Sequence, residues 1–401
     1  MKSKYPTFKD RQAILNEYRN LKMAHSPHAY VRGNTLKFYE WLETAKGQSL
    51  PSGPAVWICG DCHTGNLGPI ANIKGHIDIQ IRDLDQTVIG NPAHDLIRLG
   101  LSLASSARGS ALPGITTAKM LEEMMEGYQQ AFTKGAESAK NHVKKPDSVK
   151  IAMKNALRRS WKHLAKERIE DTQPTIPLGK KFWPLTKEEK KEVKRLFKMD
   201  EVRNLVTSLR TRDDNACVEV IDAAYWVKGC SSLGRIRIAV LVSVGKGSPK
   251  DELCLIDIKE AVAASAPRYA KAEMPKDNAQ RAVTGAQHLS PFLGKRMLAT
   301  RFLGHSVFLR EVLPQDLKLE IDQMTRDEAI KAAGFLAMIV GKAHAQQMDK
   351  ATQQKWLAEL KRNRSKTLDA PSWLWSSVVE LVVSHEAAYL EHCRKYSLIM
   401  S

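Results

Sequence analysis

Two strand-like segments joined by a glycine-containing turn lie in the middle of a chain whose remaining pattern is mostly helical. Residues 236–242 and 253–258 are rich in β-branched and aliphatic side chains, and the sequence Gly-Lys-Gly-Ser-Pro at 245–249 separates them. They are predicted to pair as an antiparallel hairpin, and residues 307–312 are a further strand candidate. Because helical stretches flank this region, the pattern predicts an α+β fold with a small β-rich unit.

The other elements follow from hydrophobic periodicity. The expected helices are at 8–24 and 34–45, over most of 95–212 and from 326 onward, and the expected strands are at 55–59 and 77–81. Within 116–134, apolar side chains recur at helical spacing, which predicts a helix facing the core: Met120, Leu121, Met124, Met125 and Tyr128. A chain of 401 residues favours two or three compact units, or one two-lobed enzyme, and needs neither disulfides nor metal to form a core.

The charge of the chain raises the question of nucleic acid as a partner. The 62 Lys and Arg residues outnumber the 44 Asp and Glu residues and give a net charge of +18. Two basic stretches, 140–168 and 180–203, are the segments that would contact phosphates, but they lack interleaved aromatic residues and any known reading motif. Since lysine-rich helical faces are usually only solvated, nucleic-acid binding is kept as an alternative and is not the leading hypothesis.

The cysteines and the N-terminal sequence bear on the compartment. The chain shows no apolar run after its basic start and no uncharged apolar window of about 18 residues, so we expect a cytoplasmic protein without a membrane partner. The six cysteines are dilute and are expected to be reduced. Cys59-x-x-Cys62-His63 matches the spacing for covalent haem attachment, but that chemistry requires export, and no second ligand pair is spaced for zinc.

Acidic and amide side chains gather directly after the first two predicted strands. Asp61 and Asn66 follow the strand at 55–59, and Asp83 and Asp85 follow the strand at 77–81. Oxygen ligands at strand ends suit hard divalent cations. An Asp five residues before an Asn, with another Asp after the next strand, is the arrangement of kinase-type phosphoryl transfer. The alternative is that these residues only form turns and cap helices.

The predicted hairpin carries a second set of candidate residues. The sequence Lys-Gly-Cys-Ser-Ser-Leu-Gly at 228–234 precedes its first strand, and its second strand ends in Lys259. A glycine-containing loop brings backbone N–H groups against phosphates, and a lysine on the neighbouring strand adds a point charge. An ordinary hairpin with a surface lysine is the alternative interpretation.

These motifs resemble known families. Gly60-Asp61-x-His63-x-x-Asn66 is similar to the catalytic loop of aminoglycoside and choline phosphotransferases and other small-molecule kinases of the protein-kinase-like fold, and the segment 82–96 resembles their metal-binding segment. A closer resemblance is to the domain of unknown function 2252 family, which is uncharacterised and mainly bacterial. Its marks are spread along the chain: Met23 to Gly33, the loop 60–66, Asp83-x-Asp85, the glycine loop with Ile258 to Ala261, Phe308 to Glu311, and Gly341 to Ala345.

The order of these motifs implies a circular permutation. In ordinary kinases the glycine loop and strand lysine precede the catalytic loop, whereas here the catalytic-type loop comes first. The resemblance therefore implies a two-lobed protein-kinase-like fold, circularly permuted, with a helical large lobe and a small β-rich lobe. Its expected parts are a first part of the large lobe at 1–212 (catalytic-type loop 59–68, metal-binding segment 81–96, helical 97–212), the small nucleotide-binding lobe at 213–315, and C-terminal large-lobe helices at 316–401.

The resemblance also implies roles for single residues. Asp61 would be the catalytic base, and Asn66 and Asp83 would hold Mg²⁺, with Asp85 as an additional ligand. Lys259 would contact the α- and β-phosphates of ATP. The glycine loop would cover the phosphates through four residues: Gly229, Ser231, Ser232 and Gly234. His63 is expected to order its loop, and Asp95 is expected to brace it by accepting backbone N–H groups.

Three functions within this fold remain open at the level of sequence. The leading prediction is an ATP- and Mg²⁺-dependent phosphotransferase whose acceptor is unknown, with a small molecule favoured over protein. The alternatives are an enzyme that transfers AMP and a pseudokinase. The kinase lysine usually pairs with a Glu on a small-lobe helix, but the expected helix at 278–287 has no acidic residue, so Glu273 or Glu311 would have to substitute.

Overall fold

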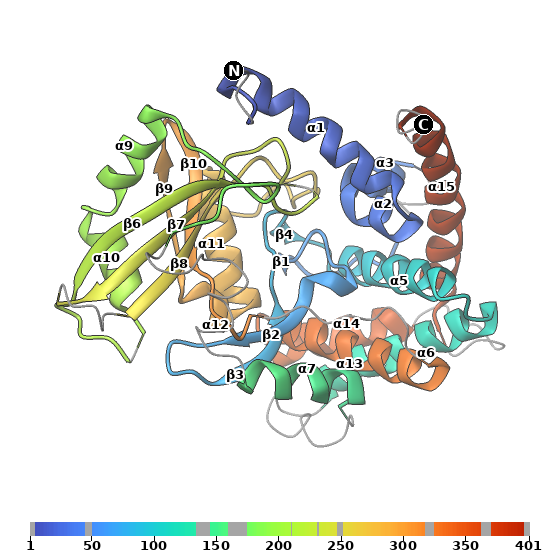
Figure 1. Ribbon diagram of the computed structural model, residues 1–401. Helices are drawn as coiled ribbons and strands as arrows, with labels where there is room; N and C mark the ends of the chain where they lie inside the picture. Colours follow the sequence, from blue (N-terminus) through green and yellow to red (C-terminus); the bar gives the residue numbers. More distant parts are fainter. Residues whose placement is uncertain are drawn as a thin grey trace.

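A computed structural model describes most of the chain: residues 5–44, 50–133, 145–158, 175–209, 211–230, 232–246, 252–316, 325–361 and 370–396. Its architecture is mixed α+β, with the large β-sheet at one side of the molecule and helices from both ends of the chain at the other (Figure 1). The α+β prediction is confirmed. In the described residues, no helix is both long enough and apolar enough to cross a membrane.

The largest sheet is antiparallel and has the strand order β5-β6-β7-β8-β10-β9. Its strands are β5 (Phe182–Trp183), β6 (Cys217–Trp226), β7 (Arg237–Gly245), β8 (Glu252–Glu260), β9 (Met297–Phe302) and β10 (His305–Glu311). The predicted hairpin is confirmed by the pairing of β7 with β8, in which Ile238 lies opposite Ile258. β5 lies ahead of the expected boundary at residue 212 and extends the sheet through its pairing with β6.

Helices cover both faces of this sheet. The helices α9 (Lys187–Leu196) and α10 (Asp200–Thr207) place Val193, Leu196 and Val202 in one core with the sheet residue Val240. Thr186 begins α9 with a reciprocal capping box, in which its side chain accepts from Glu189 N and Glu189 accepts from Thr186 N. The helices α11 (Asn278–Leu289) and α12 (Pro291–Gly294) come from the connection between β8 and β9 (Figure 1).

The helical part is built from segments on both sides of the sheet in the sequence. Its helices are α1 (Phe8–Ala24), α2 (Pro27–Gly33), α3 (Thr35–Leu42), α5 (Pro92–Gly109), α6 (Gly114–Thr133), α7 (Asp147–Arg158), α13 (Arg326–Ala345), α14 (Lys350–Lys361) and α15 (Ser372–Tyr396). The apolar stripe predicted for α6 is buried as expected. Of the basic stretch 140–168, the structure describes 145–158, so about half of this stretch lies outside the described residues.

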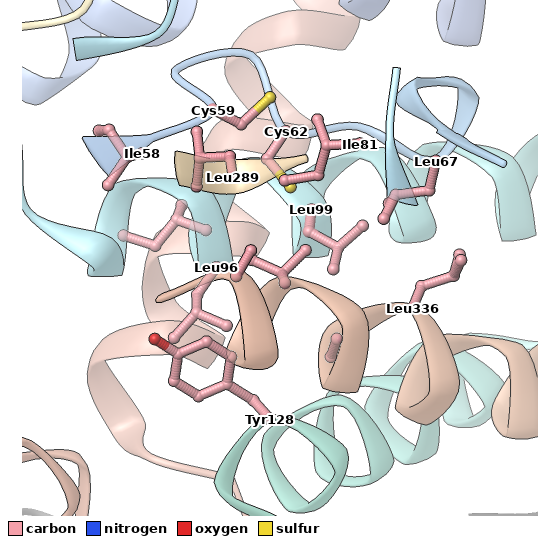
Figure 2. Close-up of a cluster of buried hydrophobic side chains, with 14 of the residues drawn as sticks. Ile58, Cys59, Cys62, Leu67, Ile81, Leu96, Leu99, Tyr128, Leu289 and Leu336 are labelled. Atoms are coloured by element: carbon pink, nitrogen blue, oxygen red, sulfur yellow. The ribbon is translucent and has the colours of Figure 1, made fainter. Parts of the chain in front are cut away.

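Two short two-stranded sheets connect the helical part to the large sheet. Strand β1 (Val56–Ile58) pairs with β4 (Val88–Gly90), and β2 (Leu67–Ala71) pairs with β3 (Ile77–Ile81). Figure 2 shows the core beneath them, where Cys59 and Leu96 lie near Leu289 of α11, Tyr128 of α6 and Leu336 of α13. Residues far apart in the sequence therefore form one hydrophobic core around the loop that follows β1.

Candidate functional site

The loop after β1 is held by backbone hydrogen bonds to a buried carboxylate. Cys59 N donates to Asp95 Oδ2 at 2.7 Å and Gly60 N donates to Asp95 Oδ1 at 3.0 Å. Asp95 lies in the first turn of α5, where a negative charge is favourable. Gly60 adopts φ 74°, and a Cβ at this position would overlap Gln86 O, so only glycine fits here. The expected bracing role of Asp95 is present in the structure.

A chain of buried polar groups fixes Asp95 in turn. His344 Nε2 of α13 lies 3.1 Å from Asp95 Oδ2, and His344 Nδ1 lies 2.9 Å from Tyr128 OH. Trp356 Nε1 then donates to Tyr128 OH at 3.1 Å. Three helices from different parts of the chain therefore converge on the carboxylate that orders the loop.

Asp61 is buried and paired with an arginine that sequence reasoning did not single out. Arg98 of α5 donates through Nε to Asp61 Oδ1 at 2.9 Å, and Asn66 Nδ2 donates to Asp61 O at 2.9 Å. Burial raises the pKa of the Asp61 carboxyl above its usual range, and Arg98 counteracts this rise. The pKa of His63 is well below its ordinary value, because of burial first and of the Arg32 and Arg98 charges second.

Lys259 meets both acidic residues of the second predicted motif. Lys259 Nζ lies 3.0 Å from Asp83 Oδ1 and 3.2 Å from Asp83 Oδ2, and it also forms an ion pair with Asp85. Lys259 is buried, whereas the Asp83 side chain keeps 38% of its exposure. Burial of the Asp85 carboxyl, together with the neighbouring Asp83 charge, raises its pKa to about 6. Burial alone would raise the pKa of Asp83, but the Lys259 and Arg310 charges lower it below its usual range.

The two glutamates considered as partners of Lys259 are not in contact with it. Glu311 pairs with Arg212 through two 2.8 Å hydrogen bonds, and Glu273 is exposed. Helix α11 instead presents Arg281, whose Nη2 donates to Asp85 O at 2.9 Å. Helix α11 therefore binds the backbone of the acidic segment, and the carboxylates that neutralise Lys259 come from that segment.

The glycine loop places two of its glycines in a backbone conformation that favours glycine. Gly229 and Gly234 adopt φ values of 86° and 88°, in the region that favours glycine. Ser232 Oγ donates to Lys228 O at 3.1 Å and accepts from Arg237 at 3.2 Å, while Arg237 forms a bidentate pair with Asp257 of β8. Ser231 lies outside the described residues. The loop is thus tied to the same strand that carries Lys259.

Metal ligation by these residues stays a prediction. In the described ranges, no group of three or more His, Cys, Asp and Glu side chains is arranged to hold a metal ion. Asn66 donates to Asp61 O through its amide nitrogen, so its amide oxygen is the atom that would face a cation. Asp85 Oδ1 is buried and, among the described residues, has no hydrogen-bond partner. The cysteines of the haem-like spacing, Cys59 and Cys62, are buried and free.

Comparison with known families identifies the chain. The family model described as "Uncharacterized protein conserved in bacteria (DUF2252)" matches residues 11–395. The chain belongs to the DUF2252 family. No curated protein and no solved structure matches it.

In this DUF2252 protein, the stretches that carry the family resemblance meet around the candidate site. His344, from 341–345, contacts the brace of the loop after β1. Arg310, from 308–311, donates to Arg82 O at 3.0 Å. A signal for Arg98 existed in the sequence: it is the one charged residue within a run of apolar and small residues at 96–107 of α5, and it is fully buried.

Proposed function

We propose that this DUF2252 protein is an ATP- and Mg²⁺-dependent phosphotransferase. The observation that carries the proposal is the pairing of Lys259 with Asp83 and Asp85 beside the loop that holds Asp61 and Asn66. Kinases bring together a strand lysine, a metal-binding aspartate and a loop with a catalytic Asp and a metal-binding Asn. The expected residues of all three parts are present here.

The arrangement of strands supports a two-lobed, kinase-like fold for this function. Lys259 lies on the third strand of the run β6, β7 and β8, the position of the lysine in protein kinases, and helix α11 follows. The permuted order is supported at the other end of the site. Gln347, just after α13, accepts from Trp57 N at 2.8 Å and donates to Trp57 O at 3.1 Å, so α13 ends beside the strand that leads into the Asp61 loop.

Asp61 is the group that would accept the proton of the acceptor hydroxyl. Its Oδ1 is held by Arg98, whereas its Oδ2 lies 3.9 Å from His63 Nε2, outside hydrogen-bond distance. The raised pKa of the Asp61 carboxyl makes it a stronger proton acceptor than an exposed aspartate. The neutral His63 ring adds no competing charge at this position.

Asp83 and Asp85 meet at Lys259, and Oδ1 of Asp85 has no hydrogen-bond partner among the described residues. Together with the amide oxygen of Asn66, these carboxylates are oxygen ligands of the kind that a hard cation prefers. When bound, Mg²⁺ would neutralise the phosphates and fix their orientation. Lys259 would then exchange its contacts with Asp83 and Asp85 for the α- and β-phosphates. This exchange predicts that nucleotide and metal bind together.

Calorimetric titration of ATP, with and without Mg²⁺, tests the proposal. Lys259→Ala and Asp83→Asn should each weaken Mg²⁺-dependent binding about tenfold or more, because each removes a charged contact. Lys331→Ala, on α13 and 59% exposed, is the matched control and should bind as the wild type. Wild-type protein that shows no Mg²⁺-dependent ATP binding would refute the proposal.

Turnover measurements separate phosphoryl transfer from the other functions of the same fold. Asp61→Asn should keep nucleotide binding and lower turnover about 100-fold or more, because the general base is lost. ADP as the product supports phosphotransfer, whereas pyrophosphate indicates AMP transfer. Binding without any turnover by the wild type, over a panel of hydroxyl acceptors and protein, indicates a pseudokinase.

A further inference from the structure

The stretch 23–33 resembles the family but has no part in the chemistry described above. It forms the end of α1 and the helix α2, which begins at Pro27 after Ser26, whose side chain accepts from Ala29 N at 3.1 Å. Arg32 lies in the last turn of α2.

Arg32 lies against the loop that holds Asp61 and Asn66. A Cβ placed on Gly65 would lie 2.9 Å from both Cζ and Nη2 of Arg32, so the guanidinium is packed directly on the Gly65 backbone. Gly65 is in the short 3-10 helix η1 (Thr64–Asn66) and immediately precedes the candidate metal ligand Asn66. The absence of a side chain at Gly65 therefore gives the guanidinium its place beside the loop.

The neighbour of Arg32 in the chain contacts the opposite part of the site. A Cβ on Gly33 would lie 2.7 Å from Cys230 Sγ, and Lys22 Nζ donates to Gly229 O at 3.1 Å. The end of α2 thus lies between the Asp61 loop and the glycine loop. These are the two loops between which the phosphates would lie if the proposed function is correct.

Arg32 is partly buried and has no anionic partner among the described residues. Within the ranges that the structure describes, no carboxylate lies at ion-pair distance from Arg32, and its Nε is buried without a hydrogen-bond acceptor. Three other cations near the site are paired with carboxylates: Arg98 with Asp61, Lys259 with Asp83 and Asp85, and Arg237 with Asp257. A fourth, Arg281, donates to backbone carbonyl oxygens, including Asp85 O. The Arg32 charge also contributes to the lowered pKa values of His63 and Arg82, which places it close to both side chains.

We propose that Arg32 binds the terminal phosphoryl group of the nucleotide. A partly buried guanidinium without a carboxylate favours a phosphate, which it can bind through two parallel hydrogen bonds. The inference rests on the proposed function. In the reaction, the bond between the terminal phosphorus and the β–γ bridging oxygen breaks, and its electron pair leaves with ADP. The acceptor oxygen bonds to the phosphorus, and its proton passes to Asp61, while Arg32 stabilises the charge on the transferred group.

Comparing a nucleoside triphosphate analogue with ADP tests the assignment. Mg²⁺ complexes of a non-hydrolysable ATP analogue and of ADP are titrated into wild type, Arg32→Gln, Arg32→Lys and Gly65→Ala. Arg32→Gln should weaken the analogue about tenfold or more and ADP less than about twofold, because only the analogue carries the third phosphate. Arg32→Lys should keep part of the affinity, since it keeps the charge and loses the bidentate geometry.

Gly65→Ala provides independent support, because the new methyl group occupies the place of the guanidinium while the arginine remains in the chain. It should show the same selective loss for the analogue. Arg394→Gln, 75% exposed on α15, is the control for removal of a guanidinium and should bind both nucleotides as the wild type.

The outcomes separate this assignment from the proposed function. Equal weakening of analogue and ADP, or no weakening of either, overturns the role of Arg32 and leaves the proposed function standing. Wild type that binds neither nucleotide refutes the proposed function and the assignment with it. Thermal unfolding of each variant shows which of them are folded, and Arg32→Lys and Gly65→Ala keep the test valid if Arg32→Gln does not fold.

Discussion

Asp95 illustrates what a single residue contributes to this site. Its side chain is only 1% exposed, and its carboxylate accepts hydrogen bonds from two backbone N–H groups of the Asp61 loop and contacts His344. The resemblance to kinase-like proteins, together with the position of Asp95 at a predicted helix start, implied the bracing role from the sequence. The partners His344 and Tyr128 could not be predicted in this way, because they come from helices more than 30 residues away.

Asp95→Asn should destabilise the protein by about 1–3 kcal/mol, because the amide replaces one acceptor oxygen and leaves a buried N–H without its partner. Urea unfolding of the variant, with Asp147→Asn as an exposed control, measures this cost. If the proposed function holds, nucleotide binding by the folded fraction should change far less than with Lys259→Ala. A stability equal to that of the wild type would contradict the bracing role.

At the scale of elements, the sequence predicts the helices and strands that have a strong local hydrophobic pattern and does not predict those whose pattern is weak. The β7–β8 hairpin has continuous aliphatic strands, and α6 has a clear apolar stripe. The strand β2 (Leu67–Ala71) was not predicted, because Gly68 and Pro69 interrupt it. Residues 217–226 were recognised only as β-rich, since β6 has a register shift between Val220 and Asp222 that disturbs its alternation.

The packing of α6 against α13 depends on a close approach of the two backbones at Gly127. A Cβ at Gly127 would overlap the carbonyl oxygen of Gly334, which is backbone and cannot rotate away. Gly127→Ala should therefore destabilise the protein by about 3 kcal/mol or more, despite the higher helix propensity of alanine.

Gly114→Ala is the matched control, because no atom lies within 4 Å of its Cβ position at the start of the same helix. It should change the free energy of unfolding by less than about 0.5 kcal/mol. Chemical denaturation measures the free energy of unfolding of both variants. Equal values for Gly127→Ala and Gly114→Ala would show that the two helices can move apart at Gly127 without cost.

At the scale of the whole molecule, the candidate site depends on residues that local patterns cannot bring together. Lys259 and Asp83 are 176 residues apart, and before the structure only the family resemblance placed them in one site.

The net charge of +18 overstates the positive charge that a nucleic acid could contact. Several of the arginines that contribute to it are buried in ion pairs near the site. Nucleic-acid binding remains a prediction, and a steep loss of affinity with salt would support it.

Buried histidines give the whole molecule an expected dependence on pH. Burial, with the Arg98 charge second, lowers the pKa of His385 to about 3, and burial lowers that of His94 to about 4. Since the unfolded chain takes up protons near pH 6.5 and the native rings do not, each group stabilises the protein above pH 6.5. That stability is lost as the pH falls toward the lowered value. The raised pKa of Asp85 acts in the opposite sense between about pH 4 and 6.

His385→Gln isolates one of these contributions. The His385 Nδ1 bonds Leu381 O at 2.9 Å, while Nε2 is buried and lacks a partner among the described residues, so a proton there would be poorly solvated. Between pH 6.5 and 4.5 the wild type should lose up to about 1.4 kcal/mol per pH unit through this group alone. The variant should show a shallower slope by that amount in urea unfolding, with His76→Gln as the control for removing an exposed histidine. Parallel slopes for wild type and His385→Gln would mean that the buried ring accepts a proton in the native state, and the packing of α15 against α5 would then have to admit water.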